Sequence, residues 1–382
     1  MITMMTAYTE ELDEADDALN EIFGQIDLGT LKKNTVGLVT CHFDFLDSGF
    51  VDELRQKLPF DIIGMTTLAS SNPHGAGIFS LSLTVLTSDD VSFETAMSGA
   101  LNPNDYREKM EGAYSGAAQK NPGKPAMIIT FFPFFKEVSG AVMHRTFDEI
   151  CGGVPFWGSI ATDPDIGYLH SKVFRNSDVS NDGMAMVLLY GQVNPEFIVV
   201  SLSKQNIRKD RGRITSSDGC VLKEINGVAA LKYLENMGVS IMKDATITVP
   251  LMVYYEGSSE PVASGIYNIN DDGSLLCAIE VTEGASITVG QITNESIMET
   301  AGESLARALE CGKKDGALFL PCITRYVMLA PNRNAELELI AEKMGGMPYM
   351  VGYSGGEICP VRDESGVLRN RFHNFTFSAC VL

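Results

Sequence analysis

The sequence lacks the features that mark membrane, zinc-binding and nucleotide-binding proteins. Its longest mostly apolar run is roughly ten residues, about half of what a membrane helix needs, and the acidic N-terminus has no signal-peptide pattern. None of the eight cysteines stands in a C-x-x-C pair, so we expect reduced, buried thiols rather than disulfides or zinc. No G-x-G-x-x-G follows a predicted strand and no Walker-A pattern occurs. We therefore expect a cytoplasmic protein with no metal, no cofactor and no membrane insertion.

Basic residues are few for a chain of 382 residues. There are 29 Lys and Arg against 49 Asp and Glu, a formal net charge of −20. Nucleic acids and anionic membranes attract basic patches, so neither is an expected partner. Hydrophobic residues make up 45% and charged residues 20%, as in a globular protein with a large core. The length predicts two domains.

Three stretches repeat one local plan, at residues 58–66, 152–159 and 345–354. In each, a helix-like segment precedes Pro plus an aromatic residue, a short apolar strand, and Gly closely followed by Ser or Thr. The recurrence predicts duplicated βαβ units. The carboxyl edge of such strands is where open α/β sheets hold ligands.

The predicted elements mix crossover units with hairpins, which indicates an α/β (mixed α+β) fold of mixed sheets with outer helices, related by duplication. The stretch 191–195 is the best linker, which separates predicted domains 1–192 and 193–382. The expected helices are 9–24, 50–58, 138–150, 229–237, 297–310 and 334–344. The expected strands are 36–41, 62–66, 78–86, 91–97, 126–131, 154–159, 172–174, 184–190, 197–202, 249–255, 264–268, 275–279, 286–289, 317–323, 349–353 and 374–381.

Polar residues gather at strand ends near the C-terminus. If strands 317–323 and 349–353 are parallel, their ends meet at one edge, and the last strand begins there too. The candidate ligand-binding residues are Cys322, Arg325, Tyr353, Ser354, Gly355, Gly356, Glu357, His373 and Asn374. The corresponding edges of the first two units supply a possible secondary set, Thr66, Thr67, Ser159 and Asp163.

Each of these features also has a structural alternative. Arg325 and Glu357 would also suit a buried ion pair that holds the strand ends. His373 and Asn374 would suit a turn into the last strand, and the two glycines a tight turn alone.

These residues carry a resemblance to the FIST family. The stretch 352–360, G-Y-S-G-G-E-I-C-P, followed by H-N-F-T at 373–376, resembles the closing signature of that family, and C-I-T-R at 322–325 resembles an upstream strand end. Weaker matches at 64–67, 158–163 and 179–183 resemble its N-terminal half, and 225–234 resembles the opening of its C-terminal half. One departure is that Leu68-Ala69-Ser70-Ser71 stands where members often carry a Gly-Glu pair. The resemblance implies an intracellular sensory module that binds small ligands, such as amino acids, in signal transduction. Without a kinase, cyclase or receiver segment in the sequence, we expect the signal to pass to a partner protein in trans.

Three functions remain open at this stage. A binding module would place the ligand carboxylate on Arg325 and the glycine amides, and its amine on Glu357. An enzyme would use Cys322 or Cys359 as nucleophile and His373 as base, but adjacent His373 and Asn374 point to opposite faces of a strand, so we assign no catalytic residue. A ligand-free adaptor would use its acidic surface to recruit a basic partner.

Overall fold

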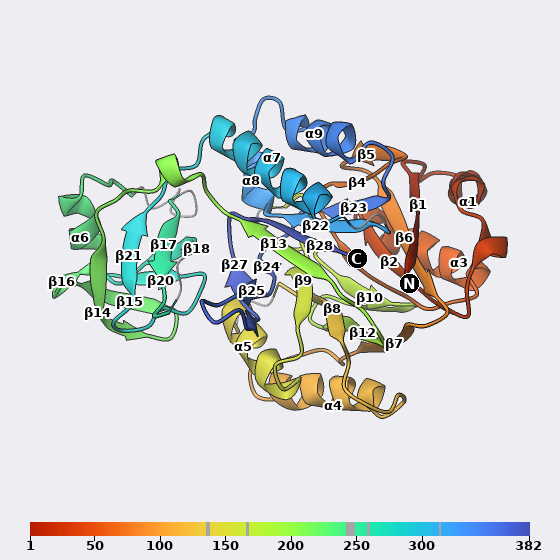
Figure 1. Cartoon of the computed structure of the whole chain (residues 1–382), viewed down its shortest axis with the longest axis horizontal. Helices are drawn as coiled ribbons and strands as arrows, with labels where there is room; N and C mark the ends of the chain where they lie inside the picture. The colour runs from red at the N-terminus through yellow and green to blue at the C-terminus, as the bar shows by residue number, and fades with distance from the viewer. Residues whose placement is uncertain (135–137, 166–167, 242–248, 258–259, 313–314) are drawn as a thin grey trace.

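Three mixed sheets form the body of the protein, and an antiparallel lobe extends from it (Figure 1). The computed structural model describes residues 1–134, 138–165, 168–241, 249–257, 260–312 and 315–382. Each of the three sheets has six strands in an equivalent order. The first two strands of each sheet are antiparallel neighbours. The next two are the parallel strands of a βαβ unit, and the last two form a hairpin at the other edge. The expected α/β fold with mixed sheets is thus confirmed.

The first sheet is built mainly from the N-terminal quarter of the chain. Helices α1 (Ala15–Gln25) and α3 (Phe50–Lys57) accompany it, with the short α2 (Asp44–Asp47). Its strands, in spatial order, are β1 (Thr3–Thr9), β6 (Leu81–Ser88), β2 (Asn34–Cys41), β3 (Ile62–Thr66), β10 (Val173–Arg175) and β11 (Asp178–Ser180).

The second sheet repeats this plan with helices α4 (Tyr106–Ala118) and α5 (Gly140–Ile150). The Ser139 side chain caps α5 by accepting a hydrogen bond from the Val142 amide. Its strands are β7 (Ser92–Met97), β12 (Ala185–Tyr190), β8 (Met127–Phe132), β9 (Phe156–Ile160), β24 (Glu357–Ile358) and β27 (Phe372–His373).

The third sheet is formed mostly by the C-terminal half, with helices α7 (Asn294–Glu310), α8 (Ile323–Met328) and α9 (Ala335–Met344). Thr293 caps α7, and α9 ends at Gly345, which adopts a left-handed conformation with φ 56°. Its strands are β13 (Glu196–Val200), β28 (Phe377–Val381), β22 (Ala317–Pro321), β23 (Tyr349–Gly352), β4 (Ser70–Asn72) and β5 (Gly75–Gly77).

The hairpins are exchanged among the sheets in a cyclic way. Hairpin β4–β5 follows β3 of the first sheet but pairs with β23 of the third. Hairpin β10–β11 follows β9 of the second sheet but pairs with β3 of the first. Strands β24 and β27 follow β23 of the third sheet but extend the second through β9. Each sheet is therefore completed by a hairpin from another unit.

The antiparallel lobe is inserted between β13 and α7. It contains α6 (Ala230–Asn236), and its strands are β14 (Gly212–Asp218), β15 (Val221–Ile225), β16 (Val228–Ala229), β17 (Leu251–Tyr254), β18 (Val262–Ser264), β19 (Ile266–Ile269), β20 (Leu275–Cys277) and β21 (Ser286–Val289). A small two-stranded arm, β25 (Val361–Arg362) and β26 (Leu368–Arg369), interrupts the chain between β24 and β27.

The three sheets share one apolar core. Leu38 and Met65 from the first sheet, Trp157 from the second, and Leu320 and Met350 from the third belong to a single cluster of fully buried side chains. The opposite face of each sheet packs under its own helices, which lie on the outside of the molecule (Figure 1). Burial of both faces explains why the strands have continuous apolar runs rather than alternating ones.

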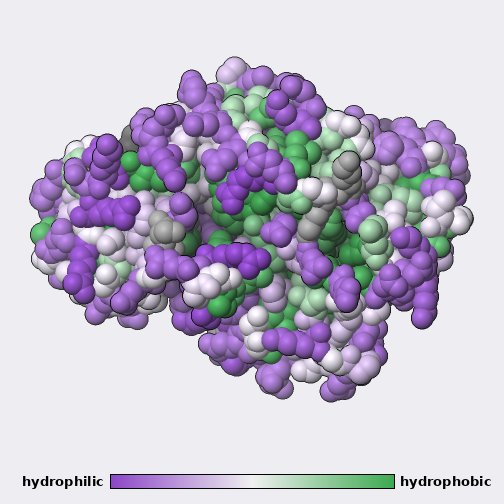
Figure 2. Space-filling model, in the orientation of Figure 1, coloured by the Kyte–Doolittle hydropathy of each residue, from purple (hydrophilic) through white to green (hydrophobic). Residues whose placement is uncertain are grey.

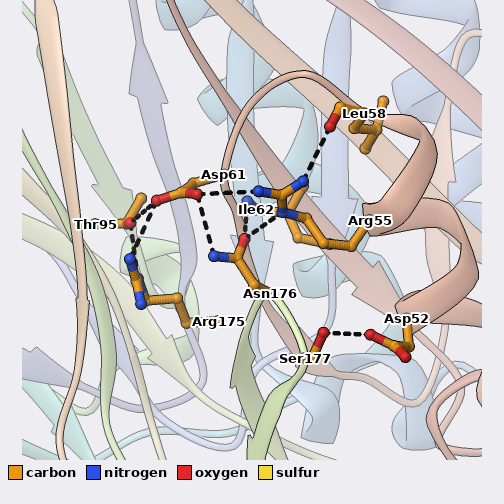
Figure 3. A network of polar contacts seen from close by, with 9 residues as sticks. All are labelled: Asp52, Arg55, Leu58, Asp61, Ile62, Thr95, Arg175, Asn176 and Ser177. Atoms are coloured by element: carbon orange, nitrogen blue, oxygen red, sulfur yellow. Dashed lines mark hydrogen bonds and ion pairs between the residues drawn. The ribbon is translucent and has the colours of Figure 1, made fainter.

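A polar network fastens one exchanged hairpin to the first sheet (Figure 3). The Asp61 carboxylate accepts hydrogen bonds from Thr95, Arg175 and Asn176, at 2.6, 3.2 and 3.1 Å. Asn176 lies in the β10–β11 turn with φ 53°, a conformation that Asn tolerates better than most residues. This network joins the turn to β7 of the second sheet and to the end of α3, since Arg55 also contacts Asp61 at 3.5 Å.

The predicted elements differ from the structure in several places. The parallel pairs β2–β3, β8–β9 and β22–β23 match the three predicted βαβ units. The predicted helix 9–24 begins later, at Ala15, because residues up to Thr9 form β1. The predicted strand 317–323 ends at Pro321, and α8 follows at once. The expected boundary at 192 and 193 lies between β12 and β13, and strand pairs of the second and third sheets join residues from both sides of it.

Within the described ranges, no helix combines the length and apolar character that crossing a membrane requires. Those ranges also contain no group of three or more His, Cys, Asp or Glu side chains placed to hold a metal ion.

Candidate functional site

The carboxyl ends of β3, β9 and β23 meet at one place in the middle of the molecule. The Thr162 amide donates to the Thr66 carbonyl at 3.1 Å, and the Gly355 amide donates to the Ile160 carbonyl at 3.0 Å. The Thr67 hydroxyl completes the ring of contacts by donating to the Tyr353 carbonyl at 2.9 Å. The three repeated strand ends therefore surround a single centre.

Glu357 occupies one of three equivalent positions around this centre. It starts the exchanged strand β24 and lies opposite Ser159 of β9. The same place in the other two hairpins is taken by Ser70, opposite Gly352, and by Val173, opposite Met65. Because the fold accepts a serine or a valine there, it does not by itself require a carboxyl group.

The carboxyl group of Glu357 is fully buried and only half satisfied. Oε2 accepts hydrogen bonds from the Thr376 amide at 3.2 Å and the Thr376 hydroxyl at 2.8 Å. Oε1 has no hydrogen-bond partner among the described residues. Burial raises the pKa of Glu357 to about 8, although Thr376, Ser354 and Cys322 favour the ionised form. At neutral pH the side chain is thus mainly a neutral acid that can donate a hydrogen bond.

Cys322 lies beside Glu357, at the point where β22 passes into α8. Its thiol is buried, and its pKa is raised by burial and further by the neighbouring Glu357 carboxyl. A raised pKa keeps the thiol protonated, the opposite of what an activated nucleophile requires. The structure thus brings Cys322 and Glu357 together as two neutral groups.

The segment 374–376 carries backbone strain next to these groups. Phe375 has φ 59°, a conformation that is unfavourable for a bulky side chain. The Asn374 amide donates to the Ala263 carbonyl of β18 at 3.2 Å, whereas its side-chain Oδ1 is buried without a hydrogen-bond partner among the described residues. Strained backbone and unsatisfied buried polar atoms are both typical of functional sites.

Two tyrosines that sequence reasoning missed belong to this neighbourhood. The pKa of Tyr168 and that of Tyr267 are raised mainly by burial, and further by Cys322 and Glu357. Although 39% of Tyr267 is exposed, the surrounding protein disfavours a charge on its hydroxyl. Tyr168 lies in the connection between β9 and β10, which is longer than the equivalent connections after β3 and β23. The length of this connection is the feature that could have indicated a role for Tyr168.

Arg325 lies away from Glu357, contrary to the expectation. Because α8 begins at Ile323, residue 325 points toward α7 and α9, where its guanidinium forms an ion pair with Glu336 at 2.6 Å. The same group donates to Thr300 and to the Ile297 carbonyl. The Tyr353 hydroxyl donates to the other oxygen of Glu336 at 3.0 Å. The alternative of an Arg325–Glu357 pair is therefore wrong, and Tyr353 belongs to the Arg325 network.

His373 is neutral, and its ring bonds to a backbone carbonyl. Its Nε2 lies 3.1 Å from the Cys359 carbonyl oxygen, and burial lowers its pKa to about 4. The Cys359 thiol contacts the carbonyl oxygens of Ile198 and Ala379 instead, and burial raises its pKa well above the usual range. In the described parts of the chain, no hydrogen bond or ion pair joins the His373 ring to the thiol of Cys322 or Cys359.

The remaining predicted residues make contacts within the fold. The Gly356 amide donates to the Ser354 hydroxyl at 3.1 Å. Because the Gly355 amide is also used, by Ile160, neither glycine amide is left to face a ligand. Thr66 and Ser159 bond to neighbouring carbonyls. Asp163 accepts from the Asp165 and His170 amides at 2.6 and 2.5 Å and so organises the β9–β10 connection.

A cleft of about 460 Å³ lies on the other side of Thr376. Its walls come from β13, α7, residues Glu260 and Pro261, and the β25–β26 arm, and the buried His373 and Thr376 also line it. Figure 2 shows this face hollowed between α7 and the arm, with hydrophobic residues inside and hydrophilic residues along both sides. Its volume suits a small molecule.

The sequence matches two family models that together cover most of the chain. The FIST N domain model matches residues 35–228, and the FIST C domain model matches residues 229–360. No match was found among the curated proteins compared. FIST domains are generally taken as sensory, ligand-binding modules of signal transduction. With matches that extend from residue 35 to residue 360, this chain belongs to the FIST family.

Proposed function

We propose that this protein is a sensory module that binds a small polar ligand at Glu357 and passes the signal to a partner protein in trans, in the cytoplasm. The family membership supports the general role, and the acidic composition supports a partner other than nucleic acid. The ligand and the partner are parts of the proposal.

The observation that carries the proposal is the half-satisfied acid. A fully buried carboxyl group with one unpartnered oxygen is costly, since a buried polar group without a hydrogen bond loses about 1–3 kcal/mol. The equivalent residues Ser70 and Val173 show that the fold accepts a side chain without a carboxyl group at this position. A ligand that completes the hydrogen bonding of Glu357 accounts for its presence.

The groups around the centre indicate the chemistry of that ligand. Glu357 in its neutral form is a donor, whereas the Oδ1 of Asn374, which has no partner among the described residues, is an acceptor. Arg325 is engaged by Glu336, so among the described residues it is not available to balance a ligand carboxylate at this centre. The site therefore favours a neutral group with adjacent donor and acceptor atoms. Amides have this pattern, and among amino acids those with amide side chains fit best.

Calorimetric titration against amino acids, simple amides and cyclic amides tests the proposal. We expect Glu357→Ala to weaken binding about tenfold or more, and Glu357→Gln, which keeps a neutral donor, to weaken it less. Ser70→Ala changes the structurally equivalent residue of another hairpin and should leave the affinity unchanged. The proposal fails if no compound binds the wild-type protein, or if Ser70→Ala weakens binding as much as Glu357→Ala.

A further inference from the structure

The cleft beyond Thr376 is a candidate for a second binding site, separate from the Glu357 centre. Two of its lining residues are polar and almost completely buried, His373 at 3% exposed and Thr376 at 0%. Thr376 contributes to both places, since its hydroxyl donates to Glu357 on one side and it lines the cleft on the other. The cleft therefore extends inward to the residue that holds the buried acid.

The charges along the cleft differ from those of the whole chain. Four basic residues line it, Lys204, Arg307, Arg362 and Arg371, against three acidic residues, Glu196, Glu260 and Glu303. The local balance of formal charge is therefore slightly positive, while the whole chain carries −20. The net charge of the chain repels anions, and the basic residues that line the cleft oppose this repulsion locally.

Within the part of the chain that the structure describes, two of the four cations have no carboxylate partner. Lys204 lies 3.8 Å from Glu260, and Arg307 lies 3.8 Å from Glu303. The Arg362 guanidinium donates to the Gly366 carbonyl, at 3.1 Å.

Arg371 packs against the Tyr255 ring, with Cζ 5.7 Å from its centroid. Among the described residues neither Arg362 nor Arg371 forms an ion pair. Both guanidinium groups therefore retain donors for a ligand.

We propose that this cleft binds a small oxyanion through Arg371 and Arg362. The planar guanidinium offers paired N–H donors that match carboxylate and phosphate oxygens. His373 is neutral at physiological pH, because burial lowers its pKa to about 4, so it adds a hydrogen-bonding group rather than a charge. The volume of about 460 Å³ accommodates a metabolite carrying such a group.

Calorimetric titration of the full chain with succinate, inorganic phosphate and neutral succinamide tests this site. Arg371→Gln should weaken oxyanion binding about tenfold or more. Arg369→Gln is the matched control, because Arg369 is two residues away, pairs with Asp363 and does not line the cleft. It should change the affinity by less than about twofold. Binding of succinate without phosphate assigns a carboxylate ligand, and the reverse assigns a phosphate.

The test separates this site from the Glu357 centre. Glu357→Gln should leave oxyanion affinity within about twofold, even if it alters binding of a neutral ligand. The inference is overturned if neither oxyanion binds at about 10 mM, if succinamide binds as well as succinate, or if Arg369→Gln and Arg371→Gln weaken binding equally.

Discussion

Arg325 and Glu336 form an ion pair inside the protein, with Nη2 2.6 Å from Oε1 and both side chains at most 2% exposed. The pair joins α8 to α9, and the further bonds of Arg325 to Thr300 and Ile297 reach α7. Tyr353, at the end of β23, donates to the second oxygen of Glu336. Both oxygens of the Glu336 carboxylate therefore have a hydrogen-bond partner, whereas Oε1 of Glu357 has none among the described residues.

Removing one member of this pair should destabilise the fold strongly. Arg325→Ala leaves Glu336 buried without a counter-charge, which costs about 3–5 kcal/mol in the free energy of unfolding. Denaturant titration followed by circular dichroism measures this cost. Arg107→Ala, which breaks the exposed pair with Glu149, should have almost no effect. If the double variant Arg325→Met with Glu336→Leu is as unstable as Arg325→Ala, the buried charge is not the cause.

The stability of the protein should fall with rising pH because of Glu357. Its pKa is about 8 in the folded chain and about 4.5 in the unfolded chain. Between these values unfolding releases a proton, so increasing pH favours the unfolded state. The stability of the wild type relative to Glu357→Gln should therefore decrease from about pH 4.5 to about pH 8, by roughly 1.4 kcal/mol for each unit of pKa shift.

Denaturant titration at a series of pH values measures this difference. Glu342→Gln, a change at an exposed residue of α9, should give a curve parallel to the wild type. A Glu357→Gln curve that also runs parallel to the wild type would show that the carboxyl ionises normally in the folded state.

Gly356 should be far less tolerant of a side chain than Gly302. A Cβ on Gly356 would lie 2.4 Å from the Phe372 ring, whereas one on Gly302 of α7 meets nothing within 4 Å. Gly356→Ala should therefore lower the melting temperature, while Gly302→Ala should stabilise the helix by about 0.5–1 kcal/mol. Thermal unfolding of the two variants measures this difference in melting temperature. Equal melting temperatures would contradict the prediction that Gly356 tolerates a side chain less well than Gly302.

Thiol reactivity should distinguish Cys311 from the other cysteines. Seven of the eight cysteines are buried and Cys311 is partly exposed. Iodoacetamide should modify Cys311 in the native protein, and Cys322 and Cys359 only at a rate at least about 100-fold lower, because they become accessible through unfolding. Mass spectrometry of the alkylated peptides measures each rate, with Cys311→Ser as the control. Rapid modification of Cys322 would instead favour a thiol-dependent enzyme.

The sequence predicts the parts of the fold that depend on local patterns. Each parallel βαβ pair has a strand, an amphipathic helix and a second strand close together, so its periodicity reveals it. The exchanged hairpins have no such signal. Strand β4 is a short Ser-Ser-Asn segment whose partner, Val351 opposite Ser71, lies far along the chain. Strand pairing at that distance depends on how the three units pack.

In the candidate site, too, the residues marked by a local sequence pattern were predicted and those brought in by long-range packing were not. Cys322 and Glu357 were predicted from strand ends, and they are neighbours in the structure. Glu336 was missed as the partner of Arg325 because an acid in the first turn of a helix already has a local explanation. Tyr267 was missed because it belongs to the inserted lobe, which no local pattern connects with the strand ends.

The exchange of hairpins also sets an order for folding. During synthesis β4 leaves the ribosome long before β23, the strand with which it pairs. The second sheet cannot be completed until β24 and β27 have been made, and the third sheet then requires β28, the last strand of the chain. Pairing across such long separations slows folding, since a large loop must close before the contacts form. We therefore expect the nascent N-terminal half to depend on chaperones until the last strands arrive.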